Sequence, residues 1–335
     1  MKLLKKLYEI SSPSGNEQVM RQFIKSLLLG MKVDFSEDKH GNIYATKGDS
    51  DTYPCIVCHT DEVHGVRPKG YRVVESDGII LGVNVDTLKT EGIGADDKNG
   101  IWVCLKALND FDVMKCAFFV SEEIGCVGSM RADMKFFDDC RFVLQCDRKG
   151  YKDFIIDASG VELCSSEFVE AIGIHQFGYE VSHGLMTDVM TLKERGLSVS
   201  ACNISCGYYN PHSETEMTRI EDLMNCYELV KHIVSTCTGV YPHEFDWDET
   251  DYGYYGKSTG SIDKCWDYNG SWNDCDWNMY SEEYDNMSNA MYNYSLENEN
   301  FSLKAFIEMY GKEYKFLDKE DFEYACEEIM GCVTY

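Results

Sequence analysis

Short, mostly apolar runs constrain the fold of this chain more than any other feature. They are YPCIVC (53–58), CAFFV (116–120) and RFVLQC (141–146), joined by the strand-like segments NIYATKG (42–48) and LSVSACNIS (197–205). A parallel strand that is covered on both faces needs apolar residues at consecutive positions, because neither face meets water. The pattern predicts an α/β three-layer sandwich, in which helices cover a mostly parallel, mixed sheet.

Helical periodicity alternates with these runs over the first 240 residues. The predicted helices cover residues 11–30, 98–111 and 218–234. Ser14 and Glu17 have the spacing of a capping box at the start of the first helix, and Gly30 is expected to end it. Thr218 and Glu221 form a second capping box at the start of the last helix.

Acidic residues and histidines follow the predicted strands. Functional groups on an open parallel sheet gather beyond the carboxyl ends of its strands. We therefore expect these side chains to meet at one edge of the sheet. They are His59, Asp96, Asp97, Glu122, Glu123, Asp147 and His212.

Imidazole and carboxylate groups in one place suit zinc and chemically similar metals. Two metal ions held ~3.5–4 Å apart need a carboxylate shared between them. We expect Asp96 to be that bridge. His59 and Asp147 would complete one metal site, and Glu123 and His212 the other.

Two further acidic residues are expected to support the metal site without binding metal. Glu122 is adjacent to a ligand, so its side chain can face the water between the metals and act as a general base. Asp61, two residues after His59, can accept a hydrogen bond from the imidazole nitrogen that does not bind metal.

Five motifs, in this order and spacing, resemble those of the co-catalytic zinc peptidases. They are H-T-D-E-V, G-I-G-A-D-D-K-N-G, S-E-E-I-G, Q-C-D-R and Y-N-P-H-S-E-T-E. The group includes peptidase T, the glutamyl aminopeptidases and the related aminoacylases and carboxypeptidases. The resemblance covers residues 1–238, and it is specific as an ordered set rather than motif by motif.

The resemblance implies a role for each matching position. The bridging aspartate of the family precedes one residue and then Lys, which selects Asp96 over Asp97. The implied metal ligands are His59, Asp96, Glu123, Asp147 and His212, with Glu122 as general base and Asp61 as the acid that supports His59. The implied cofactors are two Zn²⁺ ions, for which Co²⁺ or Mn²⁺ could substitute.

One part of the family pattern is missing. Peptidase T-like members insert a lid and dimerisation domain between the last acid and the last histidine. Only 64 residues separate Asp147 from His212 here, and they have the pattern of core strands and a helix. We therefore expect no lid, and the oligomeric state stays open. The T-D of SHGLMTDVM is similar to a substrate-side motif of the glutamyl aminopeptidases, which implies such a role for Asp188, with His183 as a second candidate.

Charge and cysteine content limit the partners and the compartment. The net charge of -27 excludes nucleic acid as a partner, because phosphate binding needs a positive surface. No apolar run reaches the ~20 residues that cross a membrane, and the N-terminus does not resemble a signal peptide. We expect a cytoplasmic protein whose 16 cysteines are reduced and mostly buried, including Cys55 and Cys58 of the C-x-x-C.

The C-terminal part differs in composition. Residues 241–335 hold 22 acidic but only 6 basic side chains, and they are rich in Tyr, Trp and Asn. This change predicts a boundary near Val240, with a di-metal catalytic domain at 1–240 and an acidic extension of unknown role at 241–335. The extension is expected to end in short helices at 302–311 and 319–331.

These observations predict an exopeptidase that hydrolyses small peptides. A deacylase of N-acyl amino acids would use the same metal centre, so the sequence leaves that alternative open. A non-catalytic scaffold is the alternative from another class. The complete ligand set and Glu122 argue against it.

Overall fold

The structure is a computed structural model that describes residues 1–245 and 303–310. The chain divides into two units, Met1–Phe245 and Asp246–Tyr335. In the second unit, only helix α10 (Leu303–Tyr310) is described, where the sequence predicts a helix at 302–311. The helix predicted at 319–331 and the rest of the extension lie outside the described residues.

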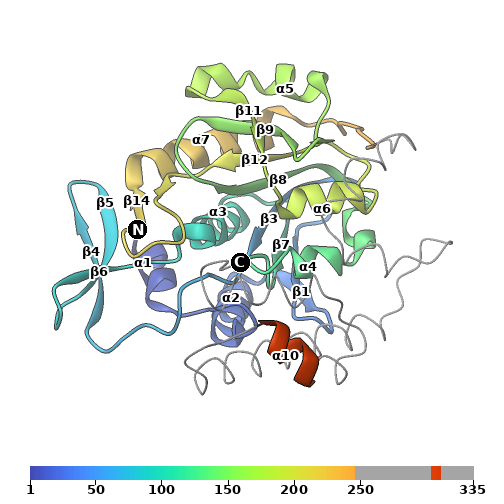
Figure 1. Ribbon diagram of the computed structural model, residues 1–335. Helices are drawn as coiled ribbons and strands as arrows, with labels where there is room; N and C mark the ends of the chain where they lie inside the picture. Colours follow the sequence, from blue (N-terminus) through green and yellow to red (C-terminus); the bar gives the residue numbers. More distant parts are fainter. Residues whose placement is uncertain (246–302, 311–335) are drawn as a thin grey trace. The chain divides into compact units, whose positions relative to one another are not determined.

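A nine-stranded sheet forms the centre of the first unit (Figure 1). Its strands are β1 (Asp34–Glu37), β2 (Ile43–Lys47), β7 (Met114–Phe119), β3 (Tyr53–His59), β8 (Cys140–Arg148), β12 (Ala201–Ser205), β9 (Asp153–Ala158) and β10 (Val161–Glu162), in this spatial order, and β11 (Glu180–Gly184) pairs with β9. The four central strands, β7, β3, β8 and β12, run parallel. Antiparallel pairs flank them, as a mixed sheet requires.

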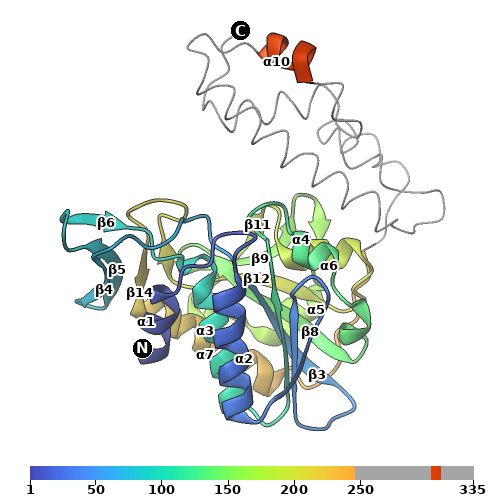
Figure 2. The same cartoon turned by 90° about the horizontal axis from the view of Figure 1, so that it is seen from below.

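Helices cover both faces of this sheet (Figure 2). One face packs against α1 (Lys2–Glu9), α2 (Gln18–Met31), α3 (Ala95–Asp110), α5 (Ser166–Ile172) and α7 (Ile220–Thr236). The other packs against α6 (Asp188–Glu194) and the 3-10 helix Met134–Phe137, near α4 (Val127–Met130). Successive side chains of β3 point to opposite faces of the sheet. Ile56 and Cys58 belong to the hydrophobic cluster on the first face, whereas Cys55 and Val57 belong to the cluster on the second. The three-layer α/β architecture predicted from the apolar runs is confirmed.

A second, smaller sheet was not predicted. It contains β13 (Tyr208–Tyr209), β14 (Met217–Arg219), β5 (Ile79–Asn84), β4 (Tyr71–Ser76) and β6 (Lys89–Glu91). Strand β14 pairs with β5, which brings chain segments that are far apart in the sequence side by side. The loop that carries His212 lies between β13 and β14, and the loop before Asp96 follows β6. The small sheet therefore brings two candidate ligand loops together.

Both predicted capping boxes are wrong. Helix α2 begins at Gln18 without a side-chain cap, because Ser14 Oγ donates to Asp61 Oδ2 at 2.7 Å instead. Glu17 Oε1 accepts hydrogen bonds from the backbone N and the hydroxyl of Ser121. The helix also continues past Gly30 to Met31. Helix α7 likewise has no side-chain cap, since Thr218 lies in β14 with its hydroxyl 2.8 Å from Tyr8 Oη.

Residues 148–211, between the candidate ligands Asp147 and His212, continue the main fold. They form β9, β10, α5, β11, α6 and β12, and three of these strands extend the main sheet beyond β12. All twelve cysteines within residues 1–245 are buried, and none of them is in a disulfide. In the part of the chain that the structure describes, no helix is both long and apolar enough to span a bilayer.

Candidate active site

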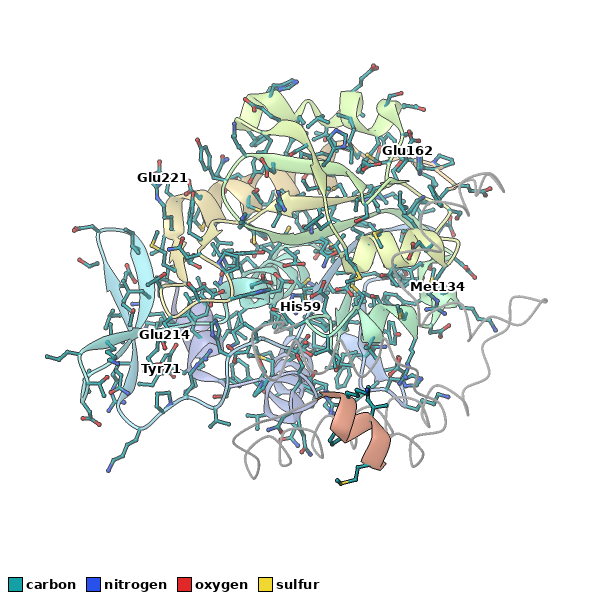
Figure 3. All side chains as sticks on the ribbon, in the orientation of Figure 1. His59, Tyr71, Met134, Glu162, Glu214 and Glu221 are labelled. Carbon is teal, nitrogen blue, oxygen red and sulfur yellow. The ribbon has the colours of Figure 1, made fainter. Side chains whose placement is uncertain are left out.

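The candidate site lies at the carboxyl ends of the central strands. His59 is the last residue of β3, and Asp147 is the penultimate residue of the neighbouring β8. Val57 pairs with Gln145, so the two candidate ligands reach the same level of the sheet. Figure 3 shows His59 in the interior of the first unit, in contrast to the exposed Glu221.

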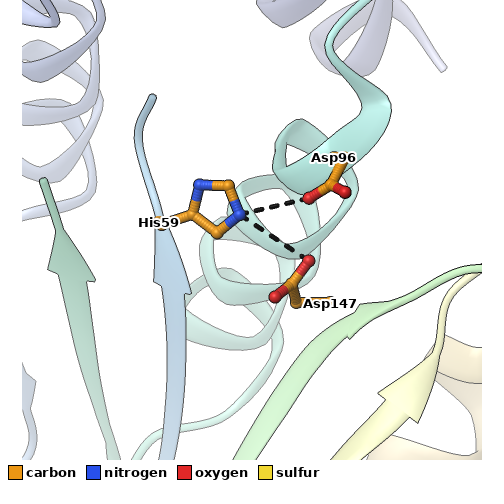
Figure 4. A group of neighbouring side chains, drawn as sticks. All are labelled: His59, Asp96 and Asp147. Atoms are coloured by element: carbon orange, nitrogen blue, oxygen red, sulfur yellow. Dashed lines mark hydrogen bonds and ion pairs between the residues drawn. The ribbon is translucent and has the colours of Figure 1, made fainter. Parts of the chain in front are cut away.

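The first group of possible metal ligands comprises His59, Asp96 and Asp147 (Figure 4). His59 Nε2 is 3.2 Å from Asp96 Oδ1 and 3.6 Å from Asp147 Oδ1. The His59 side chain is fully buried, and those of the two aspartates are at most 12% exposed. One imidazole nitrogen and two carboxylate oxygens thus converge on one point.

A second group comprises Asp96, Glu123 and His212. His212 Nε2 lies 3.4 Å from Asp96 Oδ2 and 3.0 Å from Glu123 Oε2. Asp96 therefore faces a different imidazole with each of its oxygens, which is the geometry that a bridging carboxylate needs. All five residues expected as ligands lie in these two groups.

Asp61 connects His59 to the Glu122–Glu123 pair. Its Oδ1 is 3.2 Å from His59 Nδ1, the ring nitrogen that points away from Asp96. The same carboxylate accepts hydrogen bonds from the backbone N atoms of Glu122 and Glu123, at 2.9 and 3.1 Å. Asp61 can therefore orient the imidazole and fix the turn that carries both glutamates.

Glu122 lies beside the ligand groups without belonging to either. Its Oε2 is 3.8 Å from His59 Nε2. Burial, together with the negative charges of Asp188, Asp96 and Glu123, raises the pKa of Glu122 to about 8 against the opposing effect of His59. A carboxyl group with a pKa near neutrality can both accept and release a proton in a reaction cycle.

The chemistry of the donor set fits cations. Burial, followed by the charge of Asp96, raises the pKa of Asp147 well above its ordinary value. Hydrogen bonds to Asp96 and Glu123 raise the pKa of His212 to about 10. Glu123 Oε1 is buried and has no hydrogen-bond partner among the described residues. Crowded, buried carboxylates and an unpartnered oxygen are what divalent ions would compensate.

Asp97 makes different contacts from Asp96, although the two are adjacent. Asp97 is fully buried, and its carboxylate accepts hydrogen bonds from the backbone N of His59 at 3.2 Å and of Gly100 at 3.0 Å. It therefore ties the end of β3 to the first turn of α3. Asp97 is in neither group of possible ligands, whereas Asp96 is in both.

The two residues expected on the substrate side differ in position. Asp188 is fully buried at the start of α6; Gln145 Nε2 donates to Asp188 Oδ2 at 3.2 Å and to Asp147 Oδ2 at 3.1 Å. Asp188 Oδ1 has no hydrogen-bond partner within the described ranges. His183 lies on β11 with its side chain 77% exposed, 3.6 Å from Asp157.

Sequence reasoning missed several residues that support the ligands. Gln145 contacts Asp147, the Tyr208 hydroxyl lies 3.4 Å from Asp147 Oδ1, and Glu216 binds the loop that carries Asp96. Glu216 could have been noticed, because it ends the Y-N-P-H-S-E-T-E motif. Gln145 could likewise have been noticed, because it begins the Q-C-D-R motif, whereas Tyr208 lies outside all five motifs.

Two residues of the site have a left-handed backbone although they are not glycine. Ser121, directly before Glu122, has φ 54°, and His212 has φ 59°. Such conformations are unfavourable for residues with a side chain and cluster at functional sites, where surrounding contacts maintain them. At Ser121 those contacts include the two hydrogen bonds that its backbone N and its hydroxyl donate to Glu17 Oε1.

No family model and no curated protein matches this sequence. Solved structures do match. The aminopeptidase PepT from Bacillus cereus ATCC 10987 is 15% identical, with a TM-score of 0.58 over 70% of this chain and 97% of that chain. A tripeptidase from Staphylococcus aureus subsp. aureus Mu50 is 14% identical, with a TM-score of 0.56 over 70% of this chain and 96% of that chain.

An archaeal protein matches to a similar extent. The aminopeptidase from Desulfurococcus kamchatkensis is 18% identical, with a TM-score of 0.56 over 70% of this chain and 93% of that chain. At these identities the likeness shows a shared fold. The chain therefore has the fold of these peptidases, as the motif resemblance implies.

Proposed function

We propose that this protein is a metal-dependent aminopeptidase that removes the N-terminal residue from small peptides. The observation that carries the proposal is the shared Asp96 carboxylate. Its two oxygens face His59 and His212 separately, and Glu122 lies beside the same cluster. Two ligand groups joined by one carboxylate, with a free carboxyl alongside, suit hydrolysis at a two-metal centre.

The residues of the two groups would hold two Zn²⁺ ions, with Co²⁺ or Mn²⁺ as substitutes. His59 and Asp147 would bind one ion, Glu123 and His212 the other, and Asp96 both. When bound, these ions polarise a carbonyl group and lower the pKa of water.

Glu122 would act as the general base. Its carboxylate would take a proton from the attacking water as the new C–O bond forms. The resulting carboxyl would give that proton to the leaving amine as the C–N bond breaks, which regenerates the carboxylate. Asp61 supports this role, because its hydrogen bonds hold the Glu122 backbone and the His59 ring in one unit.

A substrate-side role for Asp188 is part of the proposal. Its Oδ1 has no hydrogen-bond partner within residues 1–245, and its charge acts on Glu122. A buried carboxylate of this kind favours a cationic group, which the free amine of a peptide supplies and an N-acyl amino acid does not. His183 is exposed and lies 3.6 Å from Asp157 on the neighbouring strand β9, so we leave it out of the proposal.

The names of the structural neighbours also favour a peptidase. The three structures reported above are named an aminopeptidase, a tripeptidase and an archaeal aminopeptidase. A deacylase of N-acyl amino acids would use the same ligands and remains the alternative that the test must separate.

The test is metal analysis of the full-length protein, paired with a substrate panel. We expect about two metal ions per chain after incubation with Zn²⁺, as a shared-carboxylate centre requires. We also expect cleavage of peptides with a free N-terminus, whereas the same peptides with an acetylated N-terminus resist. Cleavage of N-acetyl amino acids alone would favour the deacylase. No metal binding and no hydrolysis with Zn²⁺, Co²⁺ or Mn²⁺ would exclude the proposed enzyme.

A further inference from the structure

Glu216 is a buried carboxylate outside both ligand groups. Its side chain is fully buried, and both of its oxygens accept hydrogen bonds. Oε2 accepts from the backbone N atoms of Ile93 at 3.1 Å and Gly94 at 2.6 Å, and Oε1 accepts from the N of Asp96 at 3.1 Å. Three backbone amides of one short segment thus converge on a single side chain from a distant part of the sequence.

The segment that Glu216 binds is the irregular start of α3. Gly94 is the N-cap of this helix, and it has no side chain with which to cap the first turn. Asp96 and Asp97 have non-helical φ/ψ angles, so the chain at this point is not held by regular helix geometry. The backbone N–H groups at a helix start have no partner within the helix. Glu216 supplies acceptors to these groups.

Glu216 also contacts the loop that follows β3. His64 Nε2 is 2.9 Å from Glu216 Oε2. His64 lies three residues after Asp61 in this loop. The imidazole is closely enclosed, because a Cβ at Gly92 would come within 2.0 Å of His64 Cε1.

Glu216 therefore joins three ligand-bearing segments. It accepts a hydrogen bond from the backbone N of Asp96. It contacts His64, which lies in the same loop as Asp61, just after His59. It also lies in the loop of His212, four residues further along the chain. Burial of a carboxylate is costly unless several donors compensate it. An apolar residue could fill the same volume, but it could not bind three amides and an imidazole at once.

We propose that Glu216 is a positioning residue that sets the distance between Asp96 and His212, and through it the spacing of the two metal sites. This inference rests on the proposed function, because it assumes that the two groups bind metal. Glu216 acts through the ligands and does not itself contact the substrate or the metals. Residues of this kind typically change metal affinity about 10–100-fold when they are replaced.

Titration of full-length protein with Co²⁺ tests the proposal, with the visible spectrum of bound Co²⁺ as a readout of ligand geometry. The variant is Glu216→Gln, whose single acceptor oxygen can serve either Asp96 N or the Ile93, Gly94 and His64 donors, but not both. The matched control is Glu214→Gln, which makes the same charge change at an exposed position of the same loop (Figure 3).

We expect Glu216→Gln to fold, as judged by circular dichroism, yet to bind at least one Co²⁺ about 10–100-fold more weakly and with an altered spectrum. Glu214→Gln should match the wild type.

A purely structural residue would lower stability but leave the spectrum of bound Co²⁺ unchanged, and that result would overturn the proposal. Wild-type affinity and spectrum in Glu216→Gln would overturn it too. Failure of the wild type to bind any Co²⁺ would instead refute the proposed function, and this inference with it.

A second pair of variants decides the matter if Glu216→Gln does not fold. His64→Leu removes the donor to Glu216, whereas His64→Gln retains an N–H donor. We expect weaker Co²⁺ binding in His64→Leu and recovery in His64→Gln. Equal Co²⁺ affinity in both variants and the wild type would contradict the proposed link between Glu216 and the loop after β3.

Discussion

At the scale of residues, the two adjacent glutamates show how burial and contacts give different roles to the same side chain. Glu123 Oε2 lies 3.0 Å from His212 Nε2 and belongs to a ligand group. Glu122 belongs to neither group, and its pKa is raised to about 8, first by burial. The backbone N atoms of both glutamates donate hydrogen bonds to the same carboxylate, that of Asp61.

We predict that Glu→Gln at these two positions causes different defects, one in turnover and one in metal binding. Glu122→Gln removes the proposed base, so kcat should fall about 10²–10⁴-fold while metal content stays at the wild-type level. Glu123→Gln removes a proposed ligand, so metal content itself should fall. Metal analysis and peptide hydrolysis on both variants give the answer. Near-normal turnover in Glu122→Gln would show that the base is another residue.

At the scale of elements, the starts of the helices depend on distant partners rather than on local caps. Helices α2, α3 and α7 all lack a side-chain cap from their own N-cap residue. Near the start of α2, the expected capping pair instead contacts residues that follow two strands of the main sheet. Ser14 donates to Asp61, which follows β3, and Glu17 accepts from Ser121, which follows β7. Capping-box spacing is a local signal, and these long-range partners outcompete it.

We predict that Glu17 stabilises the turn that carries Glu122. Replacement by Leu leaves the partly buried Ser121 N–H without its charged acceptor, which should cost about 1–3 kcal/mol of unfolding free energy. Turnover should fall as well, because Ser121 has a left-handed backbone directly before Glu122. Glu17→Gln keeps an acceptor oxygen and is the matched control. Urea unfolding and peptide hydrolysis would be measured; equal stability of the Leu and Gln variants would contradict this role.

At the scale of the whole molecule, the first unit contains its own hydrophobic core. Both hydrophobic clusters consist of residues between Met1 and Phe245. Residues 241–245 take part in this unit: Ser200 N donates to Tyr241 O, Tyr241 N donates to Arg141 O, and His243 O accepts from the buried Lys193 ammonium. The first residues of the extension, 241–245, therefore contribute to the packing of the first unit.

We predict that chain 1–245 folds and keeps activity without the rest of the extension. Chain 1–240 should be less stable, because Ser200 N loses its acceptor (~1–3 kcal/mol for an unsatisfied group) and Lys193 loses one of its three acceptors. Thermal unfolding of the two truncations and the full-length protein is the measurement. Insolubility of chain 1–245 would show that the extension is part of the core.

The buried thiols predict how stability depends on pH. Burial raises the thiol pKa of eight cysteines: Cys55, Cys58, Cys104, Cys116, Cys126, Cys164, Cys202 and Cys206. In the unfolded chain a thiol has a pKa of about 8.5. Above that pH the unfolded chain loses protons that the folded protein retains. The stabilisation is therefore complete below pH ~8.5 and is lost as the pH rises toward the folded-state values.

We expect the free energy of unfolding to fall between pH 8 and pH 9.5 by up to about 1.4 kcal/mol per pH unit for each such thiol. Urea unfolding in the presence of a reductant measures this slope. Cys202→Ala removes one fully buried thiol and should give a shallower slope than the wild type. A slope unchanged by the substitution would argue that this thiol ionises equally in both states.

The sequence by itself determined the layers of the fold and the positions of the candidate ligands. Strands buried on both faces require continuous apolar runs, and parallel strands end at a common edge, so His59, Asp147 and the Glu122–Glu123 turn had to meet. Only the tertiary structure decided which polar groups support them. Glu17 and Glu216 lie far from their partners in the sequence, and no local pattern specifies a hydrogen bond between segments that only folding brings together.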